Sequence, residues 1–255
     1  MIELFRSLFA PPRHLILLLI AAWVGLGLSQ KRAPRHQVRS AALEDLVFYS
    51  LAALVIGGRL IYVLAHLEAF SKSPLSLFAL NLDVFDLYGG LGIALITAFL
   101  YGQRQKLPLW ATLDALTPFF ATLAIGLSLS QLAAGTAFGK PTNLPWAIEL
   151  WNAPRHPTQI YQTLASLLTL GLVWQRKADP RPGRLFLVFA AWTAGWQLFL
   201  GAFRGDSVLI LGGLRLEQIL AWVGLAISLW LYEKRSAKSG ANSHPTPSPN
   251  GDGMG

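Results

Sequence analysis

The sequence contains no cysteine and few charged residues. Without cysteine among its 255 residues, the chain can form no disulfide, no thiol nucleophile and no thiolate metal site of its own. Only 13% of the residues are charged and 53% are hydrophobic. So little charge cannot cover a soluble protein of this length. The composition therefore predicts a chain that crosses a membrane several times.

Long apolar runs account for most of the sequence. A hydrocarbon core of about 30 Å takes about 20 residues of helix. We therefore expect an all-α polytopic membrane protein with about seven transmembrane helices; six or eight remain open, because the third run is short. The runs cover residues 14–29, 46–67, 88–102, 110–134, 158–175, 184–203 and 216–232.

Lys and Arg are distributed unevenly among the segments between these runs. If the amino terminus is outside, the larger share of them falls in inside segments. Cytoplasmic loops carry the Lys and Arg excess, so we expect the amino terminus outside and the carboxyl terminus in the cytoplasm. The net charge of +8 then reflects topology and anionic headgroups. Basic residues scattered among short loops do not predict nucleic-acid binding.

The two ends of the chain differ in character. No small-residue cleavage site follows the first apolar run, so we expect that span to be retained. Residues 1–235 are predicted to form a single transmembrane domain. Residues 236–255 are rich in Ser, Gly, Asn and Pro and hold almost no apolar residue. Such a segment cannot bury enough surface to order itself, which predicts a disordered cytoplasmic tail.

A polar, proline-containing segment separates the fourth and fifth apolar runs. It includes residues 138–148 and 155–161, with Arg, His, Gln, Thr and Tyr side chains. Polar groups at the edge of a bilayer are retained for function more often than those of an ordinary loop. His156 in this segment is either a base near neutral pH or a residue that orients a neighbour. The segment is the strongest candidate for a functional site.

Ionisable residues also occur inside the apolar runs. Arg59 either extends to the interface or binds a carboxylate, backbone carbonyls, water or a lipid phosphate. The preceding Gly57 and Gly58 either let a neighbouring helix approach closely or are ordinary packing residues. Asp114, one turn before Pro118, is either a hydrogen-bonded structural group, which we favour, or a functional acid.

Tyr88, Gly89 and Gly90 open the third run. The phenol can donate or accept a hydrogen bond beside a backbone that something could approach closely. The alternative is an interfacial tyrosine followed by flexible glycines.

Several short motifs follow one another in a specific order. They are Gly57-Gly-Arg-Leu-Ile-Tyr-Val-Leu64, Tyr88-Gly-Gly-Leu91, Asp114-Ala-Leu-Thr-Pro118, Phe138-Gly-Lys-Pro-Thr142, His156-Pro-Thr-Gln-Ile-Tyr161 and Leu216-Glu-Gln-Ile-Leu220. In this order they resemble the bacterial prolipoprotein diacylglyceryl transferase family, from about residue 40 to residue 232. The stretch from 139 to 161 is the most specific part.

The resemblance implies an enzyme of the bacterial inner membrane. Its substrates would be phosphatidylglycerol and a preprolipoprotein signal peptide with a lipobox cysteine. The diacylglyceryl group would move to that cysteine thiol and glycerol phosphate would leave. We expect no cofactor and no metal.

The resemblance also implies roles for individual residues. Attack by a thiolate on a phosphate ester needs a proton acceptor and positive groups that hold the departing phosphate. The implied catalytic residues are Tyr88, His156 and Arg204. The implied substrate-binding residues are Arg59, Gly89, Gly90, Ser128, Gln131, Gly139, Gln159, Tyr161 and Gln197.

The chain departs from the family pattern at its charged positions. Ser128 and Gln197 stand where the family carries arginines, and Gln131 stands where it carries asparagine. Arg204 is the cation that remains. Two functions of different class therefore stay open: diacylglyceryl transfer, and a non-catalytic member that binds lipid or a membrane partner. Transport is less favoured, because no span shows the paired acidic residues that substrate coupling would need.

Overall fold

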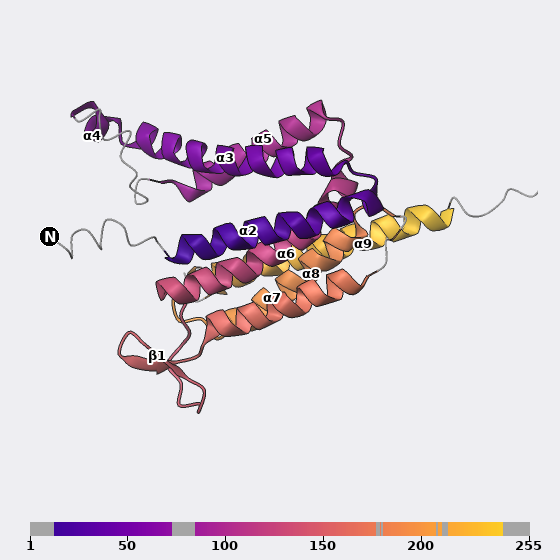
Figure 1. Ribbon diagram of the computed structural model, residues 1–255. Helices are drawn as coiled ribbons and strands as arrows, with labels where there is room; N and C mark the ends of the chain where they lie inside the picture. The colour runs from indigo at the N-terminus through magenta and orange to yellow at the C-terminus, as the bar shows by residue number, and fades with distance from the viewer. Residues whose placement is uncertain are drawn as a thin grey trace, which may run out of the picture. The chain divides into compact units, whose positions relative to one another are not determined.

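The computed structural model describes residues 13–72, 85–176, 179, 181–207, 209–210 and 214–241. The described chain is predominantly helical, and each predicted apolar run falls mainly within one helix, which confirms the all-α class (Figure 1). The long helices are α2 (Arg13–Arg32), α3 (Ser40–Ala65), α5 (Leu87–Arg104), α6 (Leu109–Ala134), α7 (Thr158–Gln175), α8 (Arg184–Gly201) and α9 (Leu216–Ala241). The short elements are η1 (Ala33–His36), α4 (Leu67–Lys72), β1 (Ile148–Leu150), β2 (Ala153–Arg155), β3 (Leu209–Ile210) and β4 (Leu214–Arg215).

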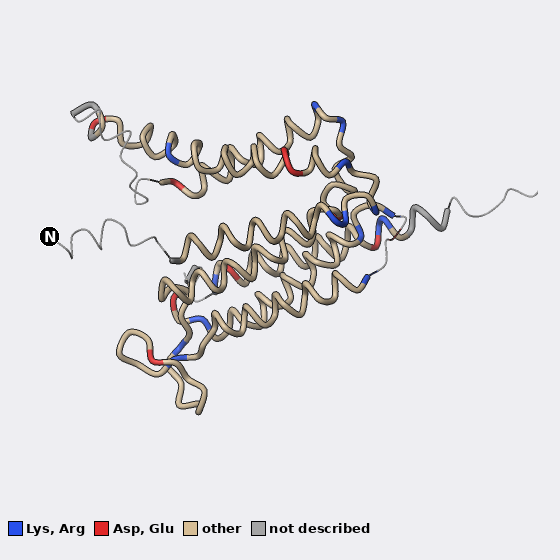
Figure 2. The backbone as a smooth tube through the Cα atoms, in the orientation of Figure 1, with Lys and Arg blue, Asp and Glu red and all other residues tan. Residues whose placement is uncertain are grey.

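Several helices have the length and composition of membrane spans. Among the described residues, four candidates satisfy both conditions: the helical stretch His14–His36, α3, α6 and α8. In the part that contains α7, α8 and α9, Figure 2 shows Lys and Arg gathered near the helix ends. A multi-pass membrane protein is confirmed, while the count of seven spans and the orientation of the termini stay predictions.

Contacts divide the chain into two compact units. The first unit comprises Met1–Ala22 and Phe120–Gly255, and the second comprises Trp23–Phe119. The prediction of one domain over residues 1–235 therefore stays a prediction. Helix α9 continues past Ser236 to Ala241, and the remainder of the predicted tail, 242–255, lies outside the described residues.

Glycines allow α3 and α5 of the second unit to pack closely. A Cβ on Gly57 would lie 2.8 Å from Ile93 Cβ, and one on Gly58 would collide with the Phe85 ring. From the other side, a Cβ on Gly90 would lie 2.6 Å from the Leu54 carbonyl oxygen. Close approach of a neighbouring helix, one of the two alternatives for Gly57 and Gly58, is confirmed.

Gly90→Ala is expected to destabilise the second unit by about 1–3 kcal/mol, the usual effect of overpacking a tight contact. The obstacle is the Leu54 backbone, which cannot rotate away. Gly92→Ala in the same helix is the matched control, because nothing lies within 4 Å of its added methyl group. Thermal unfolding of the two variants in one detergent tests this, and equal midpoints would contradict it.

Asp114 lies buried in the second unit. It is 1% exposed, and one carboxylate oxygen lies 3.9 Å from His36 Nδ1. Next to Pro118, the Phe119 N–H donates to Ser29 Oγ at 3.0 Å. These contacts favour the structural role for Asp114 over that of a functional acid.

The core of the first unit lies where α6, α7 and α8 meet. Ala121, Val173, Leu185 and Phe189 form a buried cluster there. Helix α7 packs on α8, and α8 packs on α9 (Figure 1). This packing fixes the helix ends from which the polar segments emerge.

Candidate functional site

The site is built around residues 135–157, the insert, which joins α6 to α7. Its segment 138–142 is extended and pairs on both sides, with Gly139 opposite Arg204 and Pro141 opposite Arg155. The insert is thus joined through its main chain to the segment that follows α8. The hydrogen bonds are Lys140 N–H to Phe203 O at 2.8 Å, Gly205 N–H to Phe138 O at 2.9 Å, His156 N–H to Lys140 O at 3.0 Å and Thr142 N–H to Pro154 O at 2.9 Å.

A hairpin projects from the insert. Strands β1 and β2 pair antiparallel, and the two residues between them, Trp151 and Asn152, have φ of 56° and 57°. Positive φ at both positions is the geometry of a type I′ turn, which matches the twist of a hairpin. The Trp151 indole N–H donates to the Gly135 carbonyl at 3.0 Å and ties the hairpin to the end of α6.

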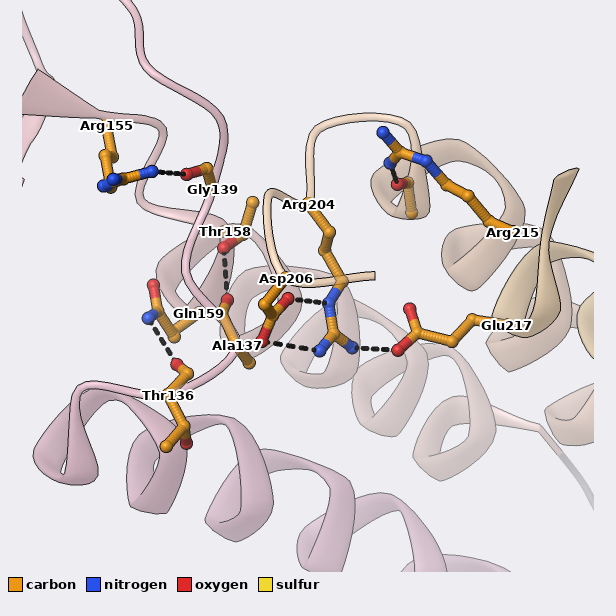
Figure 3. A network of polar contacts seen from close by, with 11 residues as sticks. Thr136, Ala137, Gly139, Arg155, Thr158, Gln159, Arg204, Asp206, Arg215 and Glu217 are labelled. Carbon is orange, nitrogen blue, oxygen red and sulfur yellow. Dashed lines mark hydrogen bonds and ion pairs between the residues drawn. The ribbon is translucent and has the colours of Figure 1, made fainter. Parts of the chain in front are cut away.

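The first residues of α7 bind the first residues of the insert (Figure 3). The Thr158 hydroxyl donates to the Ala137 carbonyl at 2.6 Å, and the Gln159 amide donates to the Thr136 carbonyl at 2.7 Å. Both side chains are 0% exposed. Gln159, implied to bind substrate, thus supports the insert, while its Oε1 has no partner among the described residues.

Gly139 occupies a position that admits no side chain. A Cβ there would collide with the His156 carbonyl oxygen and lie 2.6 Å from the His156 Cβ. Its carbonyl accepts from Arg155 Nη1 at 3.3 Å (Figure 3). Nearby, the Tyr161 hydroxyl accepts from the Trp146 indole N–H at 2.8 Å. Gly139 and Tyr161, both implied substrate-binding residues, therefore also shape the insert.

Arg204 is held between two carboxylates (Figure 3). Its Nε and Nη2 donate to the two oxygens of Asp206 at 3.0 and 3.2 Å, and its Nη1 lies 3.1 Å from a Glu217 oxygen. The Arg204 side chain is 14% exposed. The two carboxylates offset its charge and fix its orientation, and each terminal nitrogen keeps a second N–H.

A cavity of about 250 Å³ brings several predicted residues together. Ser128 and Gln131 come from α6, Gln197 from α8, and Arg204 follows α8. Arg204 is the charged group among the lining residues that the structure describes. The complete lining is Ala124, Leu127, Ser128, Gln131, Gln162, Ala165, Ser166, Thr169, Thr193, Trp196, Gln197, Leu200 and Arg204.

His156 lies beside this site in the first unit. Its ring packs against Phe203, 5.2 Å between centroids, and against Tyr161, 6.3 Å between centroids. The Nδ1 atom is buried and has no hydrogen-bond partner within the described part of the chain. An unpartnered ring nitrogen is compatible with a role in proton transfer as well as with packing.

The remaining predicted residues belong to the second unit. Arg59 is partly buried on α3, and Tyr88 is 86% exposed in the first turn of α5. The Gly89 N–H donates to Asp86 Oδ1 at 2.6 Å, which caps the helix. The group that approaches Gly89 and Gly90 is α3 itself, through Ile61 and Leu54.

Sequence reasoning missed several residues at the site. Gln162 lies one turn after Thr158 in α7, and this helical spacing was the available signal. Glu217 stood inside the Leu216–Leu220 motif without a role. Asp206 and Trp196 gave no signal of their own. Within the described ranges, no group of three or more His, Cys, Asp or Glu is placed to hold a metal ion.

Comparison with known proteins gives consistent matches. The family model "Prolipoprotein diacylglyceryl transferase" matches residues 14–233. Three similar relatives carry the name phosphatidylglycerol--prolipoprotein diacylglyceryl transferase. The one from Polynucleobacter asymbioticus is 32% identical, over 84% of this chain and 83% of the relative. The one from Gloeobacter violaceus is 29% identical, over 91% and 93%. The one from a Nostoc species is 27% identical, over 86% and 85%.

Proposed function

The chain belongs to the prolipoprotein diacylglyceryl transferase family, and on that premise we propose that it transfers the diacylglyceryl group of phosphatidylglycerol to a prolipoprotein. The proposed acceptor is the lipobox cysteine thiol of the signal peptide. No cysteine of this chain can carry the group on the way, because its sequence contains none. The observation that carries the proposal is the cavity in which α6, α8 and Arg204 meet. It places polar groups among apolar helices, where a lipid headgroup can enter.

The reaction forms one bond and breaks one bond. The cysteine sulfur attacks the glycerol carbon that bears the phosphate ester, and the carbon–oxygen bond to phosphate breaks. Glycerol phosphate leaves with the electron pair, and the thiol proton goes to a base. Arg204 is suited to the departing phosphate, because two of its N–H groups remain beyond the contacts to Asp206 and Glu217.

The reaction also needs a group that accepts the thiol proton. His156 is our candidate, because its ring lies against Phe203, next to Arg204 in the chain, and keeps an unpartnered Nδ1. Tyr88 is the second candidate, an exposed phenol that a substrate can reach. Arg59, which the resemblance implies as a substrate-binding residue, stays a prediction.

A non-catalytic role is the second candidate, and one observation favours it. Apart from Arg204, the polar groups that line the cavity are uncharged amides, hydroxyls and an indole. Such groups bind a headgroup without stabilising the charge that develops on a leaving phosphate. A lipid-binding or partner-binding membrane protein would keep this lining.

Complementation separates the two functions. A bacterium depleted of its own diacylglyceryl transferase receives this chain, and thioether-linked lipoprotein is followed by incorporation of labelled lipid. Growth with labelled lipoprotein is expected under the proposed function. A protein that inserts into the membrane at normal levels and transfers no label would overturn the proposal and leave the lipid-binding role.

We further propose that the chain lies in the bacterial inner membrane with its carboxyl terminus in the cytoplasm. The excess of Lys and Arg in the predicted inside segments supports this orientation. Reporters fused after residue 177 and after residue 240 should both report a cytoplasmic location. A periplasmic signal from either fusion would contradict the orientation.

A further inference from the structure

Two tryptophans of the insert expose their rings. Trp146 is 57% exposed and Trp151 is 65% exposed, and strand β1 lies between them. Leu144 and Pro145, which precede Trp146, are exposed as well, so the apolar surface continues along this part of the insert. A single exposed apolar side chain needs no explanation, but a group of them marks a contact surface. The proposed transfer reaction uses none of these side chains.

The backbone at Trp151 shows that the hairpin turn does not account for this residue. Its φ of 56° lies in the left-handed region, where a bulky side chain is unfavourable. A type I′ turn prefers Asn, Asp or Gly at such a position. The indole N–H makes one contact, to the Gly135 carbonyl, but most of the side chain stays exposed. Backbone strain of this kind persists mainly where a side chain has a function.

Both indoles bond to the protein through their polar edge. The Trp146 N–H donates to the Tyr161 hydroxyl at 2.8 Å, and the Trp151 N–H donates to the Gly135 carbonyl at 3.0 Å. An indole has no other hydrogen-bonding group. The exposed part of each ring is therefore hydrocarbon, and its favourable surroundings are acyl chains and not water.

The same two hydrogen bonds place the rings at the ends of helices. Gly135 follows the last residue of α6, a helix with the length and composition of a membrane span. Tyr161 lies near the beginning of α7. Figure 1 shows the hairpin beside these two helix ends. The end of a span lies where hydrocarbon meets the headgroups, which is also the level at which tryptophan is enriched.

The size of the exposed surface distinguishes a membrane from a protein partner. An aromatic side chain offers about 150–250 Å², so the two rings together expose roughly 200–300 Å². A stable protein interface takes about 800 Å² from each partner. A bilayer requires less area, because the spans already hold the chain within it. The exposed rings therefore fit a lipid surface better than a protein surface.

We propose that Trp146 and Trp151 anchor the insert in the bilayer, with both rings among the upper parts of the acyl chains. Glu149, which is exposed in β1 between the two rings, stays in water because a carboxylate is costly in hydrocarbon. The anchor fixes the depth of the insert and, through the pairing of Gly139 with Arg204, the depth of the site. The inference goes beyond the proposed function, since a non-catalytic member would be anchored in the same way.

Labelling from the lipid and from the water tests the anchor on the unaltered protein. Full-length chain in phosphatidylcholine vesicles is irradiated with an aryl diazirine, attached to the upper acyl chain in one sample and dissolved in the water in another. Mass spectrometry gives the ratio of lipid-borne to water-borne adducts at each residue. We expect this ratio at Trp146 and Trp151 to exceed that at Glu149 by about tenfold or more, because an inserted ring loses its contact with water.

Two results of this labelling would overturn the anchor. The first is a ratio at both rings equal to that at Glu149, which would leave the rings in water. The second is a low yield at both rings from either reagent, which would show that protein covers them.

Variants of the turn separate the ring of Trp151 from its hydrogen bond. Trp151→Asn suits a type I′ turn but has no ring, so lipid-borne adducts on Trp146 should fall by about threefold as about half of the anchoring surface is lost. Trp151→Phe keeps a ring without the N–H and should label like the wild type. Asn152→Gly is the matched control, because glycine suits the same turn and both rings remain.

The anchor would also be rejected by either of two patterns among these variants. Equal losses in Trp151→Asn and Asn152→Gly would indicate a general effect on the turn. A loss in Trp151→Phe as large as that in Trp151→Asn would show that the bond to Gly135, and not the ring in the lipid, holds the hairpin.

Transfer activity on the same preparation separates this inference from the proposed function. Rings labelled from the lipid in a protein that transfers no diacylglyceryl group would reject the transferase function and keep the anchor. Transfer by a protein whose rings are labelled from the water would reject the anchor and keep the transferase function.

Discussion

Arg204→Ala is expected to lower diacylglyceryl transfer by about 100-fold or more, the scale on which removal of one donor to a developing charge acts. Arg204 is the charged group among the described residues that line the cavity, and its loss would also leave Asp206 and Glu217 without their shared cation. Incorporation of labelled lipid into a lipoprotein measures the effect. Retained activity would remove Arg204 from the mechanism.

Two further variants separate the charge of Arg204 from the stability of the protein. Arg204→Lys keeps the charge but loses the forked contacts of the guanidinium group, so we expect intermediate activity. Arg184→Ala removes an arginine with a comparable ion pair, to Asp179 at 2.7 Å, outside the cavity. Similar losses of activity in Arg184→Ala and Arg204→Ala would indicate a general effect on folding.

Gly139→Ala is expected to reduce transfer by about 100-fold, because displacement of a reacting group by about 1 Å has effects of that size. The added methyl group would meet the His156 carbonyl oxygen and Cβ. Gly139 also pairs with Arg204 through the main chain, so movement of the insert displaces the arginine. Labelled-lipid incorporation and the thermal midpoint, measured together, record the change.

Gly171→Ala is the matched control for this prediction. Nothing lies within 4 Å of a methyl group added at Gly171, which is also in the first unit. We expect wild-type activity and an unchanged or slightly higher thermal midpoint, since alanine favours helix over glycine. Full activity of Gly139→Ala would show that the close contact with His156 can relax without moving Arg204.

The helices were predictable from the sequence, because a long apolar segment in a membrane must pair its own backbone N–H and C=O groups, and a helix does so. The packing of α3 on α5 was partly predictable, since glycines mark close approach. The hairpin of β1 and β2 was not predicted. Its turn is formed by Trp151 and Asn152, and tryptophan is an unusual residue at positive φ.

For the site, the sequence predicted several of the residues but not how they are arranged. Ser128, Gln131, Gln197 and Arg204 were singled out by resemblance, and the structure brings these four to one cavity. Their common surroundings were not predictable, because the pairing of Gly139 with Arg204 joins segments separated by α7 and α8. The roles of Asp206 and Glu217 as partners of Arg204 depend on the same long-range contact.

The hydrogen bonds of the insert define an order of assembly. Trp151 to Gly135, Thr158 to Ala137 and Gln159 to Thr136 span 16, 21 and 23 positions of sequence. Short closures of this kind lose little chain entropy and are available once α6 and the start of α7 have been synthesised. The bonds from Lys140 and Gly205 across to the opposite segment must wait until α8 is complete. A nascent chain therefore carries an ordered insert before it carries a working site.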